Sequence, residues 1–252
     1  MCRRLFALAV CLAAAASLLL AETQSKTMPL RVEAATWSRS AHPLPYALNP
    51  DPALRNARIP SPNGKYAIAC NSVPQEHRIS EGVSETREAP ACEFEAEDKR
   101  VLIDLEVGPE ALWAPDSDAV AVTHSRGGAL GTYRVLIYRP ENSGATDIAN
   151  AVRQDLAKRF PACAGARAEC TSAQRKAMRK DVEWVNVAAI RWMEKSDRLL
   201  MLAWVPDSSA FGANLGRYNG YVVDARHGRI LSRYSEREFK RRFKKYCGDW
   251  GL

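Results

Sequence analysis

The segment LWAPDSDAVAVT, residues 112–123, decides the fold because two other segments of the 252-residue chain echo it. The first echo is IPSPNGKYAIAC, residues 59–70, and the second is IRWMEKSDRLLMLAW, residues 190–204. Each segment contains a turn that is followed by an alternating apolar run, which is typical of a turn that leads into a half-buried strand. We therefore expect repeated architecture and not repeated chemistry.

The echoed positions agree residue by residue. Trp113 aligns with Trp192, a Ser-Asp pair follows both at the same distance, and Pro62 aligns with Pro115. This pattern resembles the W-S-P-D-G/S turn-plus-strand signature of WD40-like repeats, as found in TolB-like periplasmic β-propellers and in the propellers of prolyl oligopeptidase-type enzymes. The resemblance implies that the turn closes a tight corner and that the Trp packs between blades.

The spacing of the echoes predicts an open arrangement. Propeller blades recur every 40 to 50 residues or so and close with at least four, whereas here the spacings are 53 and 79 residues and three copies occur. We expect a mainly β protein of the α+β class, with antiparallel meander sheets that resemble two or three blades of an open or incomplete propeller. The expected strands cover residues 65–70, 100–107, 119–125, 133–139, 185–192, 198–205 and 219–234, with an acidic loop between the first two.

Two helical regions interrupt and end the strand pattern. Residues 147–181 are an expected helical insertion, because Ile148, Val152 and Leu156 lie four apart and Thr171 is a good N-cap for a second helix. Residues 235–247 are an expected amphipathic helix that opens with a Ser-x-x-Glu capping box, has Gly248 as its C-cap and carries a basic outer face.

The N-terminus predicts export. Two arginines precede an apolar run that ends at Leu20, and Ala21 follows, which is the pattern of a cleaved secretory signal over residues 1–21. The apolar run is shorter than the roughly 20 residues that a membrane anchor needs. Residues 22–58 carry many prolines and little periodicity, which indicates an extended arm, and residues 59–252 form the expected β domain. No transmembrane span is expected after signal removal, and the expected location is periplasmic or secreted.

The cysteines fit that location, because thiols pair in oxidising compartments. We predict a disulfide between Cys70 and Cys92, which lie at facing ends of two apolar runs, and a second between Cys163 and Cys170, which are seven residues apart. Cys247 is left over. A zinc site at the second pair is disfavoured, since no His or further Cys lies nearby.

Charge is distributed unevenly. Residues 76–116 carry a net charge of −8, residues 153–180 of +6 and residues 226–245 of +7. The two basic segments could bind an anionic partner such as an envelope protein, a lipid headgroup or a polysaccharide, or they could be solvated faces. Nucleic acid is not an expected partner of an exported protein. The candidate anionic-partner surface consists of Arg175, Lys176, Arg179, Lys180, Lys240, Arg241, Lys244 and Lys245.

No catalytic, cofactor or metal site is predicted. Ser125 lacks the preceding glycine and the following helix of a nucleophile elbow, and the four histidines form no metal-binding pair. The favoured hypothesis is an exported, non-enzymatic interaction or scaffolding protein of the envelope. One alternative is an enzyme, such as a hydrolase, whose site is assembled from loops, and another is a secreted effector. A cluster of His and carboxylates around a pocket would favour the enzyme.

Overall fold

The computed structural model describes residues 36–46, 56–80, 83–103, 105, 107–127, 132–166 and 168–249. All of them belong to one structural unit, Ala35–Leu252. The predicted signal peptide, residues 1–21, lies outside the described residues, as do residues 22–35 and 47–55 of the predicted arm.

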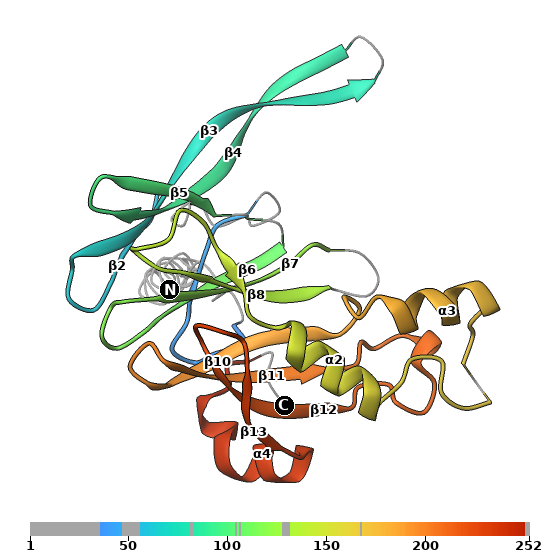
Figure 1. The fold of residues 1–252 in the computed structure, drawn as a ribbon. Helices are drawn as coiled ribbons and strands as arrows, with labels where there is room; N and C mark the ends of the chain where they lie inside the picture. The colour runs from blue at the N-terminus through green and yellow to red at the C-terminus, as the bar shows by residue number, and fades with distance from the viewer. Residues whose placement is uncertain are drawn as a thin grey trace, which may run out of the picture. The chain divides into compact units, whose positions relative to one another are not determined.

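Three antiparallel sheets follow one another along the chain, so the described fold is mainly β with helices, as predicted (Figure 1). Each contains a four-stranded meander in chain order, and the second sheet gains β1 at its edge. Among the described residues the sheets do not close into a barrel or a propeller. The first sheet contains β2 (Arg58–Pro60), β3 (Tyr66–Ser80), β4 (Val83–Ala96) and β5 (Lys99–Ile103); the second contains β1 (His42–Pro43), β6 (Val107–Trp113), β7 (Val120–Ser125), β8 (Tyr133–Tyr138) and β9 (Thr146–Asp147); the third contains β10 (Asn186–Glu194), β11 (Arg198–Trp204), β12 (Tyr218–Asp224) and β13 (Ile230–Tyr234).

Each echoed segment forms the first hairpin of a meander. In register, Pro60 pairs with Ala67, Trp113 with Val120 and Trp192 with Leu199, which are equivalent positions of the three segments. The first two turns also share their backbone conformation. Gly64 and Ser117 occupy the same place and have φ angles of 72° and 68°, and their N–H groups donate to Ser61 and Ala114 at the same offset.

The turns of successive hairpins are hydrogen-bonded to one another. The N–H of Asn63 donates to Oγ of Ser117 over 3.0 Å, and the N–H of Ser196 donates to Oδ2 of Asp116 over 2.9 Å. The repeated turn residues therefore place polar groups where adjacent sheets meet. Their role is architectural.

Two strand predictions were wrong in detail. The expected acidic loop after Cys70 is a long hairpin, in which β3 and β4 pair from Tyr66 and Ala96 outward to Ser80 and Val83. The expected strand over residues 100–107 is divided, because β5 pairs with β4 in the first sheet and β6 begins the second. The chain crosses between the sheets there, and periodicity alone does not reveal a crossing.

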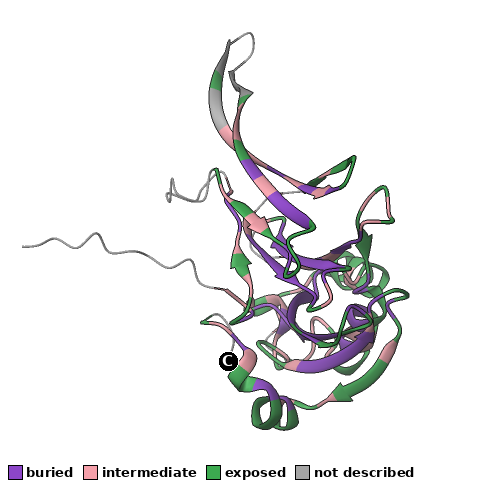
Figure 2. Cartoon of the chain, turned by 90° about the vertical axis from the view of Figure 1, so that its left-hand side faces the viewer, coloured by how far each residue is buried: buried purple, intermediate pink, exposed green. Residues whose placement is uncertain are grey.

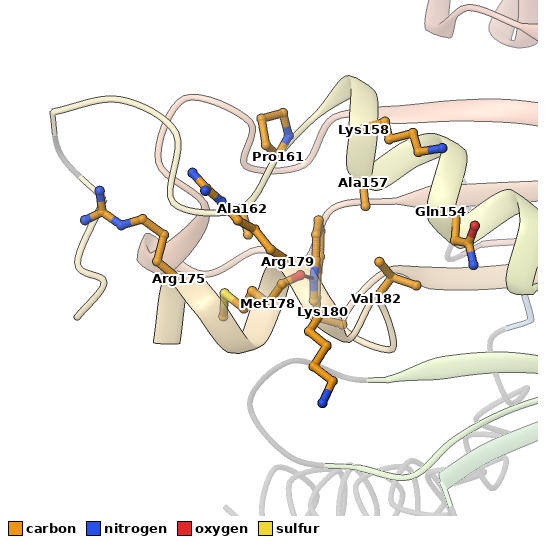
Figure 3. A pocket seen from close by; sticks show the side chains of 11 residues that line it. Gln154, Ala157, Lys158, Pro161, Ala162, Arg175, Met178, Arg179, Lys180 and Val182 are labelled. Carbon is orange, nitrogen blue, oxygen red and sulfur yellow. Dashed lines mark hydrogen bonds between the residues drawn. The ribbon is translucent and has the colours of Figure 1, made fainter. Parts of the chain in front are cut away.

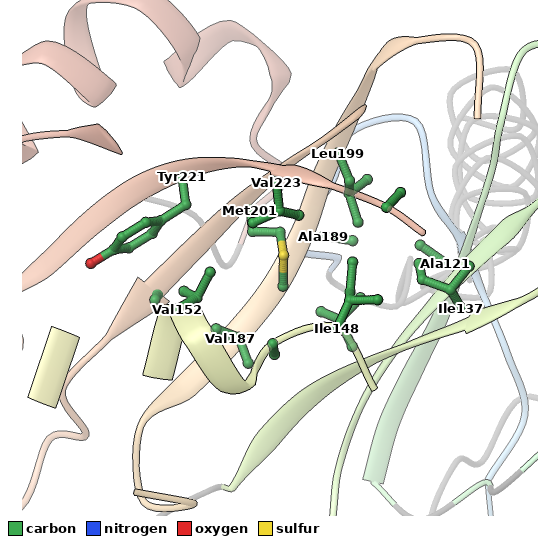
Figure 4. Close-up of a cluster of buried hydrophobic side chains, with 14 of the residues drawn as sticks. Ala121, Ile137, Ile148, Val152, Val187, Ala189, Leu199, Met201, Tyr221 and Val223 are labelled. Carbon is green, nitrogen blue, oxygen red and sulfur yellow. The ribbon is translucent and has the colours of Figure 1, made fainter. Parts of the chain in front are cut away.

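Apolar residues fill the space between successive sheets. One cluster joins the first and second sheets and includes Ile68, Phe94 and Trp113. A larger cluster joins the second and third sheets and continues under the first helix (Figure 4). The central strands β7 and β11 are buried along most of their length, whereas the helices expose most of their residues (Figure 2).

The two end sheets finish differently. The outer face of the third sheet is covered by the last helix, whose Phe239 and Phe243 pack on Leu200, Leu202 and other sheet residues. On the first sheet, residues that alternate with the buried ones are charged and pair with one another across strands. These ion pairs are Arg58–Glu95, Arg100–Glu93 and Arg100–Glu95.

Three helices are described: α2 (Asn150–Arg159), α3 (Ser172–Lys180) and α4 (Glu236–Phe243). Capping boxes begin α3 at Thr171 and α4 at Ser235. Short 3-10 turns follow at Ser209–Phe211 and Lys244–Tyr246. Gly248 does not cap α4, contrary to expectation. It lies against the backbone of Thr36, where an added Cβ would come within 2.2 Å of the carbonyl oxygen.

The described part of the arm is built into the sheets. β1 pairs with β6, and Ser38 forms an isolated bridge with Cys247. Both Ser38 and Leu44 are buried. The expected extended conformation holds at β1, but residues 36–46 contribute to the core, which their proline-rich sequence did not indicate.

Both predicted disulfides are formed. Cys70 and Cys92 face each other in register on β3 and β4, and Cys163–Cys170 ties the connection between α2 and α3. Cys247 is a buried free thiol. Within the part of the chain that is described, no helix is long and apolar enough to cross a membrane.

Candidate functional site

Six of the eight candidate basic residues line two hollows at different helices, and Lys176 and Lys240 line neither. Arg175, Lys176, Arg179 and Lys180 are exposed on α3. Lys240, Arg241, Lys244 and Lys245 are exposed on α4 and the 3-10 turn after it. The fold therefore does not join the two basic segments into one surface patch with a shared hollow.

The first hollow, here the C-terminal basic hollow, has a volume of about 500 Å³. Its lining contains no carboxylate, and Lys240 is not part of it. The lining residues are Arg39, Arg241, Arg242, Lys244, Lys245, Cys247 and Gly248.

Sequence-distant segments build this hollow. The N–H of Arg39 donates to the carbonyl of Tyr246 over 2.9 Å, and Gly248 donates to Trp37, so the arm is held beside the last turn. The guanidinium of Arg242 lies 4.9 Å from the ring centroid of Tyr234. The ammonium of Lys245 lies 5.1 Å from the ring centroid of Tyr246, so these contacts hold the backbone and two of the cations.

The cations of the hollow form no close ion pairs among the described residues, although Glu238 of α4 interacts electrostatically with Arg241 and Arg242. Among the described residues, no carboxylate lies within 4.0 Å of the charged groups of Arg39, Arg241, Lys244 or Lys245. Like charges held close together repel, and an anion that enters relieves this repulsion. Burial raises the pKa of Cys247 to about 11, so this thiol is protonated at neutral pH and adds no negative charge.

The second hollow, here the α2–α3 pocket, has a volume of about 440 Å³ (Figure 3). Its apolar lining is Ala157, Pro161, Ala162, Met178, Val182 and Trp184, and its polar lining is Gln154, Lys158, Arg175, Arg179 and Lys180. Lys176 lines only a neighbouring shallow hollow on α3, together with Ser172 and three of these cations. Here too no lining residue is a carboxylate.

Ser125, His124 and His227 lie in a strand and a turn of the sheets. Ser125 is buried at the end of β7, and its Oγ accepts a hydrogen bond from the N–H of Gly127 over 3.0 Å. His124 is buried in the same strand. His227 lies in the β12–β13 turn, with Nδ1 3.0 Å from Oδ2 of Asp224. Among the described residues, no group of three or more His, Cys, Asp and Glu side chains could hold a metal ion.

Glu110 is the buried ionisable group that stands out. It lies on β6, 3% exposed, and accepts hydrogen bonds from the backbone N–H groups of Trp37 (2.7 Å) and Ser38 (3.3 Å). Desolvation raises its pKa to about 8, although both hydrogen bonds act in the opposite direction. Its two acceptor bonds hold the arm against the second sheet, so its role is in assembly of the fold.

The sequence missed Arg39 and Arg242 as members of the C-terminal basic hollow. Arg242 falls within the basic segment and could have been included from its charge alone. Arg39 lies about two hundred residues away in the sequence, and no local pattern signals its position. No protein-family model matches the chain, and neither the curated proteins nor the solved structures include a significant match to it.

Proposed function

We propose that the protein is an exported, non-enzymatic interaction or scaffolding module of the cell envelope, and that it binds anionic lipid headgroups through the C-terminal basic hollow. The observation that carries the proposal is the convergence of five cationic residues on one hollow without a lining carboxylate. Each cation close to an anionic membrane surface contributes about 1 kcal/mol to the free energy of binding. Five of them are enough for reversible adsorption.

Export to a periplasmic or secreted location is part of the same proposal. The two disulfides support it, because such bonds persist in oxidising compartments and are rare in the cytosol. The three meanders, in this proposal, are blades of an open propeller that resembles the TolB-like repeats. The equivalent register of the echoed hairpins supports that reading.

Vesicle co-sedimentation tests the proposed binding. We expect the mature protein to bind vesicles that contain phosphatidylglycerol and not vesicles of phosphatidylcholine alone, with affinity that falls as salt is raised. The double variant Arg241→Gln/Lys244→Gln should bind roughly tenfold more weakly or worse, since each removed charge contributes about 1 kcal/mol.

The matched control is Arg237→Gln/Lys240→Gln, which removes two exposed cations of the same helix that do not line the hollow. This control should bind nearly as well as the wild type. An equal loss in both double variants would show that diffuse charge, and not the hollow, is responsible. Binding to an anionic polysaccharide but not to vesicles would replace the lipid as the partner.

A further inference from the structure

The α2–α3 pocket combines an apolar floor with a cationic rim, and the proposed lipid adsorption at α4 does not use it. Its floor is fixed by Trp184, which is 6% exposed, with Nε1 donating to the carbonyl of Met178 over 3.0 Å. The indole ring also lies 4.9 Å from the ring of Phe211. Because the polar end of the indole is already bonded, the ring offers the pocket an apolar surface.

The helix that forms the outer wall, α3, packs on the core through Met178 alone among its described residues. α3 has no buried residue, and Met178 is its one residue of intermediate burial. The Cys163–Cys170 disulfide fixes the chain before α3, and the buried start of β10 fixes the chain after it. A helix tethered at both ends in this way keeps a pocket open that side-chain packing alone would close.

The rim determines the charge of the occupant. Lys158 of α2 and Arg179 and Lys180 of α3 have no carboxylate within 4.0 Å among the described residues. Arg175 donates from Nη2 to the carbonyl of Cys170 over 3.3 Å and retains its other donors. The pocket, at about 440 Å³, is within the usual size range of small-molecule sites, roughly 300–1,000 Å³.

We propose that the α2–α3 pocket binds a free single-chain anionic amphiphile of the fatty-acid type. The alkyl chain lies on Trp184, Met178 and Val182, and the carboxylate lies at the rim cations. The occupant is assigned because it matches the pocket in two ways. Its alkyl chain covers the apolar floor, and its carboxylate supplies the negative charge that the cationic rim lacks. An inorganic anion would leave the floor uncovered, and an uncharged chain would leave the rim cations unpaired.

Isothermal titration of the mature protein with decanoate, below its critical micelle concentration, tests the proposal. Decanoate should bind with a stoichiometry of one, decanol several-fold more weakly, and butyrate and decyltrimethylammonium not measurably. Equal binding of decanoate and decyltrimethylammonium would overturn the role of the rim. Equal binding of decanoate and butyrate would overturn the role of the floor.

Variants locate the binding. Arg179→Gln should weaken decanoate binding roughly fivefold, in line with loss of a charge-assisted hydrogen bond. Lys176→Gln removes a cation from the same helix that does not line the pocket, and it should change affinity less than twofold. Equal weakening by both variants would place the ligand elsewhere on α3 and contradict the proposal.

A blocked pocket provides the second test. Ala157→Trp fills the space from the α2 side and should abolish decanoate binding, with an unchanged circular dichroism spectrum showing that the fold is retained. Undiminished binding by a folded Ala157→Trp variant would sink the proposal. Decanoate binding and vesicle binding can be tested independently, because the Arg241→Gln/Lys244→Gln variant should retain decanoate binding in full.

Discussion

The interface between the first and second sheets and the interface between the second and third sheets are built from equivalent hairpins but are held differently. Buried and partly buried hydrogen bonds cross the second–third interface, whereas the first–second interface is mainly apolar and its hydrogen bonds between described residues lie at turns and exposed edges. The bonds across the second–third interface are Trp192 Nε1 to Leu112 O (2.8 Å), Ala189 N to Thr123 Oγ1 (3.0 Å), Arg139 Nη2 to Ser196 O (2.6 Å) and Tyr133 N to Asn186 Oδ1 (2.7 Å).

The aligned tryptophans show this difference most directly. Trp192 donates its indole N–H across the interface, while Trp113 packs on Phe94 with ring centroids 6.0 Å apart. The Nε1 atom of Trp113 is buried and has no hydrogen-bond partner among the described residues. Sequence identity at repeated positions therefore predicts burial, but it does not predict whether the polar atom is used.

The largest expected effect is the loss of either indole. Trp113→Ala and Trp192→Ala should each reduce the free energy of unfolding by about 3–5 kcal/mol, as large-to-small changes in a core do. Urea denaturation measures both. A loss below about 1 kcal/mol for Trp113 would show that the first sheet contributes little to the cooperative unit, and would break the equivalence of the two interfaces.

The buried Glu110 gives the second largest effect. Its folded pKa of about 8 lies above the ordinary value of 4.5, so the folded state retains a proton that the unfolded state has lost. The contribution of this group to the free energy of unfolding is therefore fully present below about pH 4.5. It falls by a few kcal/mol as the pH rises from there towards 8. Glu110→Gln should flatten this decline, as measured by unfolding at several pH values. The exposed Glu183→Gln is the control and should leave the pH dependence unchanged.

A smaller effect separates the two indole N–H groups. Trp192→Phe leaves the Leu112 carbonyl without its donor, whereas Trp113→Phe removes an N–H that has no partner among the described residues. We expect Trp192→Phe to be more destabilising by about 1–2 kcal/mol. Equal losses in parallel urea titrations would mean that the polar link at Trp192 adds nothing to the interface.

The smallest expected effect concerns the turns. Asp116→Ala removes the acceptor for the N–H of Ser196 and should cost about 0.5–2 kcal/mol in melting experiments. The neighbouring Asp118→Ala changes an exposed side chain and should cost less than about 0.5 kcal/mol. A larger loss at Asp118 than at Asp116 would contradict the turn-to-turn link.

Local signals in the sequence predicted the elements better than their connections. The echoed turns, the N-cap at Thr171, the capping box at Ser235 and both disulfides follow from residue types and their positions along the chain, and the structure contains them. The long β3–β4 hairpin was missed because its strands carry many charges, which periodicity rules assign to loops. The passage of the chain from β5 in the first sheet to β6 in the second was missed because the alternating apolar pattern of the sequence continues between the two strands.

The candidate sites required tertiary information. Arg39 joins the C-terminal basic hollow only because the arm pairs with β6 and lies beside Tyr246. Likewise, the sequence marked the cations of α3 but not the apolar floor beneath them, since Trp184 and Pro161 belong to segments outside the helix. The sequence revealed the basic residues, but it did not reveal the hollows that they line.

The different endings of the two outer sheets bear on how the protein behaves at high concentration. With α4 over one outer face and ion pairs across the other, a second copy could bury little apolar area by stacking on either end. Leu102, 67% exposed, is a large apolar side chain on the charged face, and a single residue gives little drive for association. The described outer faces therefore disfavour growth by stacking of one copy on the next.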